Sequence, residues 1–261
     1  GGRAAGARAR VGRRGTGGPC GTWPRATAAL AAGLGSSSLH GDPENWERRD
    51  GLAQRFDVSA SNIAVASGID DLQSLAVRAF LDPDEVVVTS LGAYPTFNYH
   101  VAGGGGRLHS VPYRDDANDI DALLRAAHET KARMLFLANP DNPTGSWAGG
   151  AELARLLDGL PSGTWLILDE AYLEFGPADG LPLDVEDPRL IRFRTFSKAY
   201  GMAGLRIGYA LGEKSALAAF DRVRLHFGVN RIAQAGALAA LADQAFLTGV
   251  ASAAAAGRAA Y

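Results

Sequence analysis

The chain has 261 residues, of which 47% are hydrophobic and 21% are charged, a composition typical of a globular protein with one large or two small domains. A formal net charge of -2 gives no basic field for nucleic acid or an anionic membrane, so we expect small-molecule partners and neither of those two. One cysteine, Cys20, excludes an internal disulfide framework, and without clustered ligand residues we expect no metal.

Residues 1–22 differ from the rest of the chain. They are rich in glycine, alanine and arginine, and they contain no acidic residue and no apolar stretch of signal-peptide length. We expect a disordered or mistranslated leader, and a targeting peptide is the less favoured alternative. No apolar run approaches the roughly 20 residues that cross a bilayer. We therefore predict a cytoplasmic protein whose folded domain covers residues 23–261.

From Pro24 onward, helical and strand patterns alternate. Alanine-rich or amphipathic spacing predicts helices over residues 25–34, 45–56, 70–80, 95–102, 119–130, 151–158 and 214–224, and the alanine tract at 253–256 predicts another. Short apolar stretches bounded by turn residues predict strands over residues 63–66, 86–90, 107–111, 133–138, 165–169 and 190–195. This alternation predicts an α/β fold, a mainly parallel sheet with helices on both faces.

Chemically capable residues follow several of these strands. Gly68, Asn142 and Lys198 come after predicted strands, and Asp169 ends one. Ligands of open α/β sheets bind beyond the carboxyl ends of the strands. We therefore expect these residues to meet in one site.

Lys198 is one of only three lysines, with Lys131 and Lys214, in a chain that otherwise uses arginine. An isolated lysine is usually a surface cation. A lysine can, however, lose its proton and attack a carbonyl, which arginine cannot do. Lys198 is therefore the candidate nucleophile, provided that its neighbours fit such chemistry.

The neighbours match the needs of a carbonyl cofactor that accepts electrons. Asp169 ends an apolar strand, where a buried carboxylate is costly unless it meets a cation such as a pyridinium N–H. Asn142, in a turn with two prolines, and Tyr172 can both donate to a phenolic oxygen. Phe97 is the candidate for stacking on the ring, with Tyr94 as the competing residue and a core position as the alternative for Phe97.

A phosphate site is predicted beside this group. Gly68, Ile69 and Asp70 open a helix after a strand, so their free backbone N–H groups and the helix dipole attract an anion. Ser197 adds a hydroxyl next to the lysine. Arg206, eight residues after Lys198, adds a bidentate cation.

Together these motifs resemble the pyridoxal-phosphate-dependent aminotransferases of class I and II, of fold type I, and among them the histidinol-phosphate aminotransferase group. The matching segments are 67–70 (SGID), 94–97 (YPTF), 139–145 (NPDNPTG), 169–175 (DEAYLEF), 194–209 (RTFSKAYGMAGLRIGY) and 227–234 (FGVNRIAQ). The resemblance implies the large-domain fold of these enzymes, with a sheet of the seven-stranded type and pyridoxal 5'-phosphate as cofactor. It implies that Lys198 is the Schiff-base lysine.

The resemblance also implies the whole enzyme's activity, which is amino transfer between an L-amino acid, or histidinol phosphate, and a 2-oxo acid. It implies a homodimer, in which His40 stands near a position where similar enzymes often carry a tyrosine that reaches the partner's phosphate. Similar enzymes continue for roughly a hundred residues beyond Tyr261. We therefore expect the C-terminal small domain, with the arginine that binds the substrate carboxylate, to be largely absent.

Two alternatives remain open from the sequence. The same cofactor site would serve a decarboxylase of a phosphorylated amino acid, because the residues named above do not select which bond at the substrate carbon is broken. The other alternative is an inactive, truncated fragment that binds pyridoxal phosphate without completing a reaction.

Overall fold

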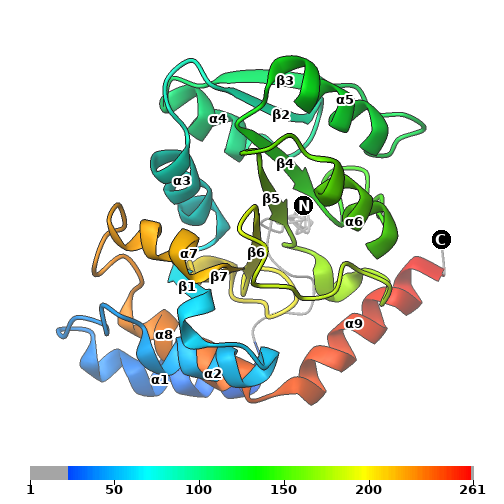
Figure 1. Ribbon diagram of the computed structural model, residues 1–261. Helices are drawn as coiled ribbons and strands as arrows, with labels where there is room; N and C mark the ends of the chain where they lie inside the picture. The colour runs from blue at the N-terminus through cyan, green and yellow to red at the C-terminus, as the bar shows by residue number, and fades with distance from the viewer. Residues whose placement is uncertain (1–22, 260–261) are drawn as a thin grey trace, which may run out of the picture.

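A seven-stranded sheet forms the centre of the part of the chain that the computed structural model describes, residues 23–259 (Figure 1). The leader expected over residues 1–22 lies outside these described residues. The strand order across the sheet is β1-β7-β6-β5-β4-β2-β3. The strands are β1 (Ile63–Ala66), β2 (Val86–Ser90), β3 (Arg107–Val111), β4 (Met134–Ala138), β5 (Trp165–Asp169), β6 (Leu190–Thr195) and β7 (Gly208–Gly212).

The sheet is mainly parallel, which confirms the predicted fold class. Only β7 runs antiparallel, and it does so to both of its neighbours, β1 and β6. The strand prediction missed β7, because glycines at both of its ends look like turn residues in a sequence. At Gly208 a Cβ atom would lie 2.9 Å from the carbonyl oxygen of Arg194 and 3.1 Å from the backbone of Gly68. Glycine therefore lets three backbone segments approach at this point.

Helices cover both faces of the sheet. They are α1 (Pro24–Gly33), α2 (Trp46–Phe56), α3 (Ile69–Phe80), α4 (Thr96–Gly103), α5 (Ile120–Thr130), α6 (Gly150–Gly159), α7 (Lys214–Asp221), α8 (Arg231–Leu241) and α9 (Gln244–Ala259), with short 3-10 helices at Leu34–Ser36, Ala60–Asn62, Leu173–Phe175 and Ala203–Leu205. α3, α4 and α7 pack on one face. α5 and α6 pack on the other, beside α2 and α8.

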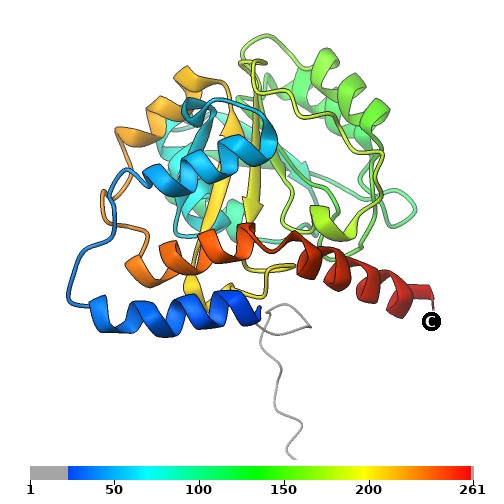
Figure 2. The same ribbon diagram turned by 90° about the horizontal axis from the view of Figure 1, so that it is seen from below.

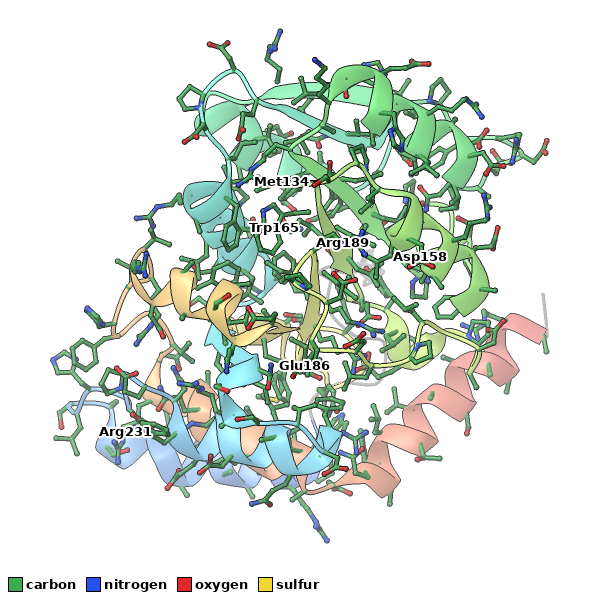
Figure 3. The ribbon with its side chains drawn as sticks, in the orientation of Figure 1. Met134, Asp158, Trp165, Glu186, Arg189 and Arg231 are labelled. Carbon is green, nitrogen blue, oxygen red and sulfur yellow. The ribbon has the colours of Figure 1, made fainter. Side chains whose placement is uncertain are left out.

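The alternation of side chains along β4 explains the two layers. Met134 and Phe136 point to the core under α3 and α4, whereas Leu135 and Leu137 point to the core under α5 and α6. Figure 3 shows Met134 at the start of β4 and Trp165 at the start of β5, and these two residues pair across the strands. Met134 and Trp165 mark the amino ends of their strands, so the polar residues that follow these strands lie at the opposite, carboxyl end.

The C-terminal part of the described chain contains a helix that we did not predict. α8 lies beside α1 in Figure 2, and α9 extends from it along the edge of the molecule. Gly236 of α8 lies against Leu30 and Met202, where a Cβ atom would lie within 3.0 Å of both side chains. Among the described helices no single one is long and apolar enough to cross a membrane. α8 and α9 meet that criterion of length and composition only when counted as a pair, and the pair is bent by 81°.

Trp23 joins α1 to the segment that carries Lys198. Its side chain is fully buried, and its indole N–H donates to the carbonyl oxygen of Ala199 at 3.2 Å. The ring centroid lies 4.7 Å from that of Tyr200 and 5.0 Å from that of Phe246. The start of the described chain is thereby packed directly behind the lysine.

Replacing Trp23 with alanine should lower the free energy of unfolding by about 3–5 kcal/mol, because the substitution empties a large buried volume and removes a hydrogen bond. Urea unfolding followed by circular dichroism measures the change. Trp46→Ala is the matched control, because Trp46 is 56% exposed and should change stability by less than about 1 kcal/mol. Equal losses in the two variants would contradict the anchoring role of Trp23.

Candidate functional site

A cavity of about 290 Å³ opens at the carboxyl ends of β4, β5 and β6. The last residue of each of these strands, Ala138, Asp169 and Thr195, lines it. Of the four residues expected to meet, Asn142, Asp169 and Lys198 line this cavity, whereas Gly68 does not line it and lies against Arg206, which does. The residues predicted for the site that line this cavity are Ile69, Asp70, Asn142, Asp169, Tyr172, Ser197, Lys198 and Arg206.

Asp169 is the buried carboxylate of the cavity, with 8% of its surface exposed. Its Oδ1 accepts a hydrogen bond from the backbone N–H of Ala171 at 2.9 Å, and its Oδ2 accepts one from Gln73 Nε2 at 3.3 Å. Burial raises the pKa of Asp169 to about 6, and the neighbouring charge of Glu170 adds to this, while Ala171, Lys198 and Gln73 oppose it. A cation bound in the cavity would favour the ionised form.

Lys198 follows β6 and faces the same cavity as Asp169. Its Nζ lies 5.0 Å from the centre of the Tyr172 ring, a cation–π contact. The ammonium group also acts on Asp169, whose pKa it lowers. Lys198, the predicted nucleophile, is therefore close to Asp169, the predicted partner of a ring nitrogen, and to Tyr172, a predicted donor to a phenolic oxygen.

The loop after β4 is fixed by its own hydrogen bonds. The side chain of Asn139 donates to the carbonyl oxygen of Ala148 at 3.0 Å and accepts from the N–H of Ala148 at 2.8 Å. The backbone N–H of Asn139 donates to the carbonyl oxygen of Asp169 at 2.8 Å, and Asp141 accepts from the hydroxyl of Tyr113 at 3.0 Å. Asn142, between these anchors, lines the cavity.

The anion end of the cavity lies at the start of α3. Gly68 has φ 90°, a backbone conformation that favours glycine, and a Cβ atom there would force the Arg206 guanidinium to move. Arg206 Nη1 donates to Ser197 Oγ at 3.3 Å, and Nη2 donates to the carbonyl oxygen of Ser67 at 3.4 Å. The N–H of Gly68, expected to be free, donates instead to the carbonyl oxygen of Ala66 at 2.8 Å. The start of α3, a hydroxyl and a guanidinium are thus gathered where the sequence predicted a phosphate.

The expectation that Phe97 stacks on a cofactor ring needs correction. Its side chain is fully buried, and its ring stacks on that of Phe136, with the centroids 4.4 Å apart and an interplanar angle of 16°. Phe97 does not line the cavity, whereas Tyr94 does. The physical reason is the apolar core between α4 and the sheet, which takes up the phenylalanine and leaves the more polar tyrosine at the surface.

Glu170 is a buried residue that the sequence analysis did not assign. It accepts hydrogen bonds from Arg194 Nε at 2.8 Å and from Arg192 Nε at 3.1 Å. Burial acts to raise the pKa of Glu170, but Arg194 and Arg192 outweigh it, so the pKa lies below its usual value. This cluster ties the end of β5 to β6, directly after Asp169 in the chain and shortly before Lys198.

A second and larger hollow, of about 630 Å³, adjoins the first. Pro140, Asn142 and Tyr172 line both. Trp147 and Phe175 add aromatic walls, and Arg258 adds a positive charge. The hollow gives a bound molecule space beyond the cofactor-sized cavity, on the side of Asn142 and Tyr172.

His40 does not line the cavity. Its ring lies against that of Phe227, with the centroids 4.5 Å apart, on an exposed surface. Leu39, Leu225 and Phe227 are large apolar residues with 58%, 75% and 54% of their surface exposed. We call His40 and these three residues the apolar rim. It continues toward Arg206, because Leu225 and Arg206 line the same surface depression.

The sequence of the chain matches one protein family and named relatives. The family model for aminotransferase class I and II matches residues 22–258. Histidinol-phosphate aminotransferase 2 of Pseudomonas aeruginosa is 39% identical over 233 residues, which are 88% of this chain and 63% of that protein. The protein of the same description from Nitrosospira multiformis is 39% identical over 234 residues, 88% of this chain and 59% of its own length. The chain thus spans about three-fifths of these curated relatives.

Solved structures share the fold. Histidinol-phosphate aminotransferase from Sinorhizobium meliloti, in complex with pyridoxal-5'-phosphate, is 46% identical with a TM-score of 0.89, over 91% of this chain and 65% of that one. An aspartate aminotransferase mutant from Thermus thermophilus is 22% identical with a TM-score of 0.81, over 92% of this chain and 70% of that one, and this likeness concerns the fold alone. The large-domain fold of fold-type-I aminotransferases, expected from the sequence, is confirmed.

Glu170→Ala should lower the free energy of unfolding by about 3–5 kcal/mol, because it leaves two buried guanidinium groups without their carboxylate. Denaturant unfolding at neutral pH measures this. Glu186→Ala is the control, because Glu186 is exposed on the segment before β6 (Figure 3) and should change stability by about 0.5 kcal/mol or less. A Glu170 variant as stable as the control would show that the cluster does not hold the two strands.

Asp169→Asn should remove a pH-dependent loss of stability from the cofactor-free chain. The folded-state pKa of about 6 exceeds the ordinary value of 3.8, so the folded chain binds this proton more tightly. The free energy of unfolding therefore falls as the pH rises from about 4 through about 6, by up to roughly 3 kcal/mol. Urea unfolding across this range tests it, with the exposed Asp158→Asn as control. Parallel profiles for the wild type and Asp169→Asn would refute the raised pKa.

Proposed function

We propose, since this chain belongs to the class I and II aminotransferase family, that it binds pyridoxal 5'-phosphate and takes part in amino transfer from an L-amino acid or histidinol phosphate to a 2-oxo acid. The observation that carries this proposal is that Lys198, Asp169 and Arg206 line the same cavity. Because the chain spans 63% of the Pseudomonas relative, the activity of the whole protein belongs to the proposal.

The residues present fit this cofactor. Arg206, Ser197 and the backbone N–H groups of Ile69 and Asp70 would hold the phosphate, and Gly68 leaves the space that the guanidinium needs. Asn142 and Tyr172 would donate to the phenolic oxygen. The bound cofactor supplies a carbonyl that captures an amine and a ring that accepts electrons.

The remaining chemistry is acid–base and electrostatic work by two side chains. Lys198 would hold the cofactor through its amine. Once released, the amine would take the proton from the substrate α-carbon and return it to the carbon that carried the cofactor's carbonyl oxygen. The Asp169 carboxylate would accept the ring N–H and keep that nitrogen protonated, which also repays the cost of its own burial. Its raised pKa without a ligand fits a carboxylate that awaits a cation.

Relatives favour histidinol phosphate as the amino donor. Proteins of that description match this chain at 39% identity, whereas an L-threonine-O-3-phosphate decarboxylase matches at 23%, which concerns the fold alone. The aromatic walls of the larger hollow, Trp147 and Phe175, would suit a flat ring, and Arg258 would suit an anion. The decarboxylase alternative is therefore not favoured.

A homodimer in a reducing, cytoplasmic compartment completes the proposal. The apolar rim exposes two leucines and a phenylalanine, and Phe227 lies against His40; exposed apolar residues that gather on a domain usually mark a contact with another chain. Its position beside Arg206 would bring a second copy close to the phosphate end of the site. His40, within the rim, would then lie at the subunit boundary.

Purified chain with pyridoxal phosphate should develop the visible absorbance of lysine-bound cofactor, and histidinol phosphate or glutamate should bleach it. Lys198→Ala should abolish both the absorbance and turnover, because no amine remains at this position. Lys214→Ala is the matched control, because Lys214 is exposed on α7. Turnover by Lys198→Ala would refute the assignment of the nucleophile.

Two other results would redirect the proposal. Release of carbon dioxide without any need for an oxo-acid acceptor would favour the decarboxylase. A lysine-bound cofactor that responds to no donor would favour a fragment that binds without completing the reaction.

A further inference from the structure

Gln73 is a buried amide within the first turns of α3, on the side of the helix that faces the sheet. Only 1% of its surface is exposed, and the other residues that α3 buries are apolar, among them Ile69, Leu72 and Ala76. A polar side chain placed among apolar ones costs stability unless its hydrogen bonds are made. Its partners therefore indicate what it does.

Both ends of the Gln73 amide are occupied. The hydroxyl of Thr96 donates to Gln73 Oε1 at 3.0 Å, and Gln73 Nε2 donates to Asp169 Oδ2 at 3.3 Å. Turning the amide over would place its oxygen against a carboxylate oxygen, which is repulsive. The charge of Asp169 therefore selects the amide orientation, and the Thr96 hydroxyl secures it.

The two oxygens of Asp169 are held from different elements. The N–H of Ala171, on the same strand end, holds Oδ1, and Gln73 from α3 holds Oδ2. With both held, the carboxylate has one orientation at the wall of the cavity. Thr96 also lines this cavity, so the chain of hydrogen bonds starts and ends at its surface while Gln73 lies behind it.

We propose that Gln73 is a positioning residue, which turns the Asp169 carboxylate toward the bound cofactor and is itself oriented by Thr96. This rests on the proposed role of Asp169 as partner of the pyridine nitrogen. Gln73 does not line the cavity, so it acts only through the carboxylate. The site then depends on an amide donor from α3, the side chain of Gln73, in addition to Lys198 and Asp169.

The charges around Asp169 favour such a donor. Glu170, next in the chain, disfavours ionisation of Asp169, whereas Lys198 favours it. Asp70 and Arg206 line the same cavity from the start of α3 and from the segment before β7. Burial acts in the same direction as Glu170, and a hydrogen bond to the charged form opposes both.

Gln73→Met keeps the length of the side chain and removes the amide. We expect about tenfold weaker binding of pyridoxal phosphate, measured by titrating the cofactor-free protein, because a hydrogen bond to a buried charge is lost. Gln54→Met, an exposed position on α2, is the matched control and should bind as the wild type does. Thr96→Val should lose part of the affinity, and Thr96→Ser, which keeps the hydroxyl, should restore most of it.

A second measurement needs no cofactor. Removing the donor raises the pKa of Asp169 further, so the decline in the free energy of unfolding with rising pH should continue above about pH 6 in Gln73→Met. In Gln54→Met this decline in the free energy of unfolding should end at the same pH as in the wild type. A role of Gln73 in packing alone would lower the whole profile without moving its midpoint.

The outcomes separate the two proposals. Failure of the wild type to take up pyridoxal phosphate would refute the proposed function, while the unfolding profile would still decide whether Gln73 acts on Asp169. Equal affinities and superimposable profiles for Gln73→Met and Gln54→Met would overturn the inference.

Discussion

A buried ion cluster at the ends of β5 and β6 is the constraint on which the site depends. Glu170 accepts hydrogen bonds from Arg192 and Arg194, two guanidinium groups from the neighbouring strand. Burying three charges is tolerable only because each finds a partner of opposite sign at hydrogen-bond distance. The cluster therefore holds the strand ends that present Asp169 and Lys198, and it does so without using either of them.

Two adjacent carboxylates consequently have opposite environments. Two arginines outweigh burial at Glu170 and lower its pKa, whereas burial dominates at Asp169 and raises its pKa to about 6. The protein pairs the first carboxylate with two arginines and leaves the second turned to the cavity, where hydrogen-bond donors and Lys198 oppose the effects of burial and of Glu170. Such a difference between neighbouring acids is typical of functional sites, because the second is prepared for a charge that a ligand brings.

The cavity has a chemical direction. Arg206 and the start of α3 favour an anion, Asp169 favours a cation, and Lys198 lines the same cavity beside Tyr172. Gly68 has the positive φ that favours glycine at the anion end, and the guanidinium occupies the space that a side chain there would need. The larger hollow with its aromatic walls extends from the Asn142 side, so a substrate would approach there and leave the phosphate end to the cofactor.

Local signals in the sequence were enough to predict the alternation of strands and helices, with Asp169 at the end of a strand and Lys198, Asn142 and Gly68 beyond strands, because apolar runs and turn residues are local. The sequence did not predict β7, whose glycines are explained only by backbones that approach from distant segments. The burial of Phe97, the pairing of Glu170 with β6 and the contact of Gln73 with Asp169 were decided by tertiary structure. Each depends on which side chains face one another across separate elements, a property of register and packing that no local pattern contains.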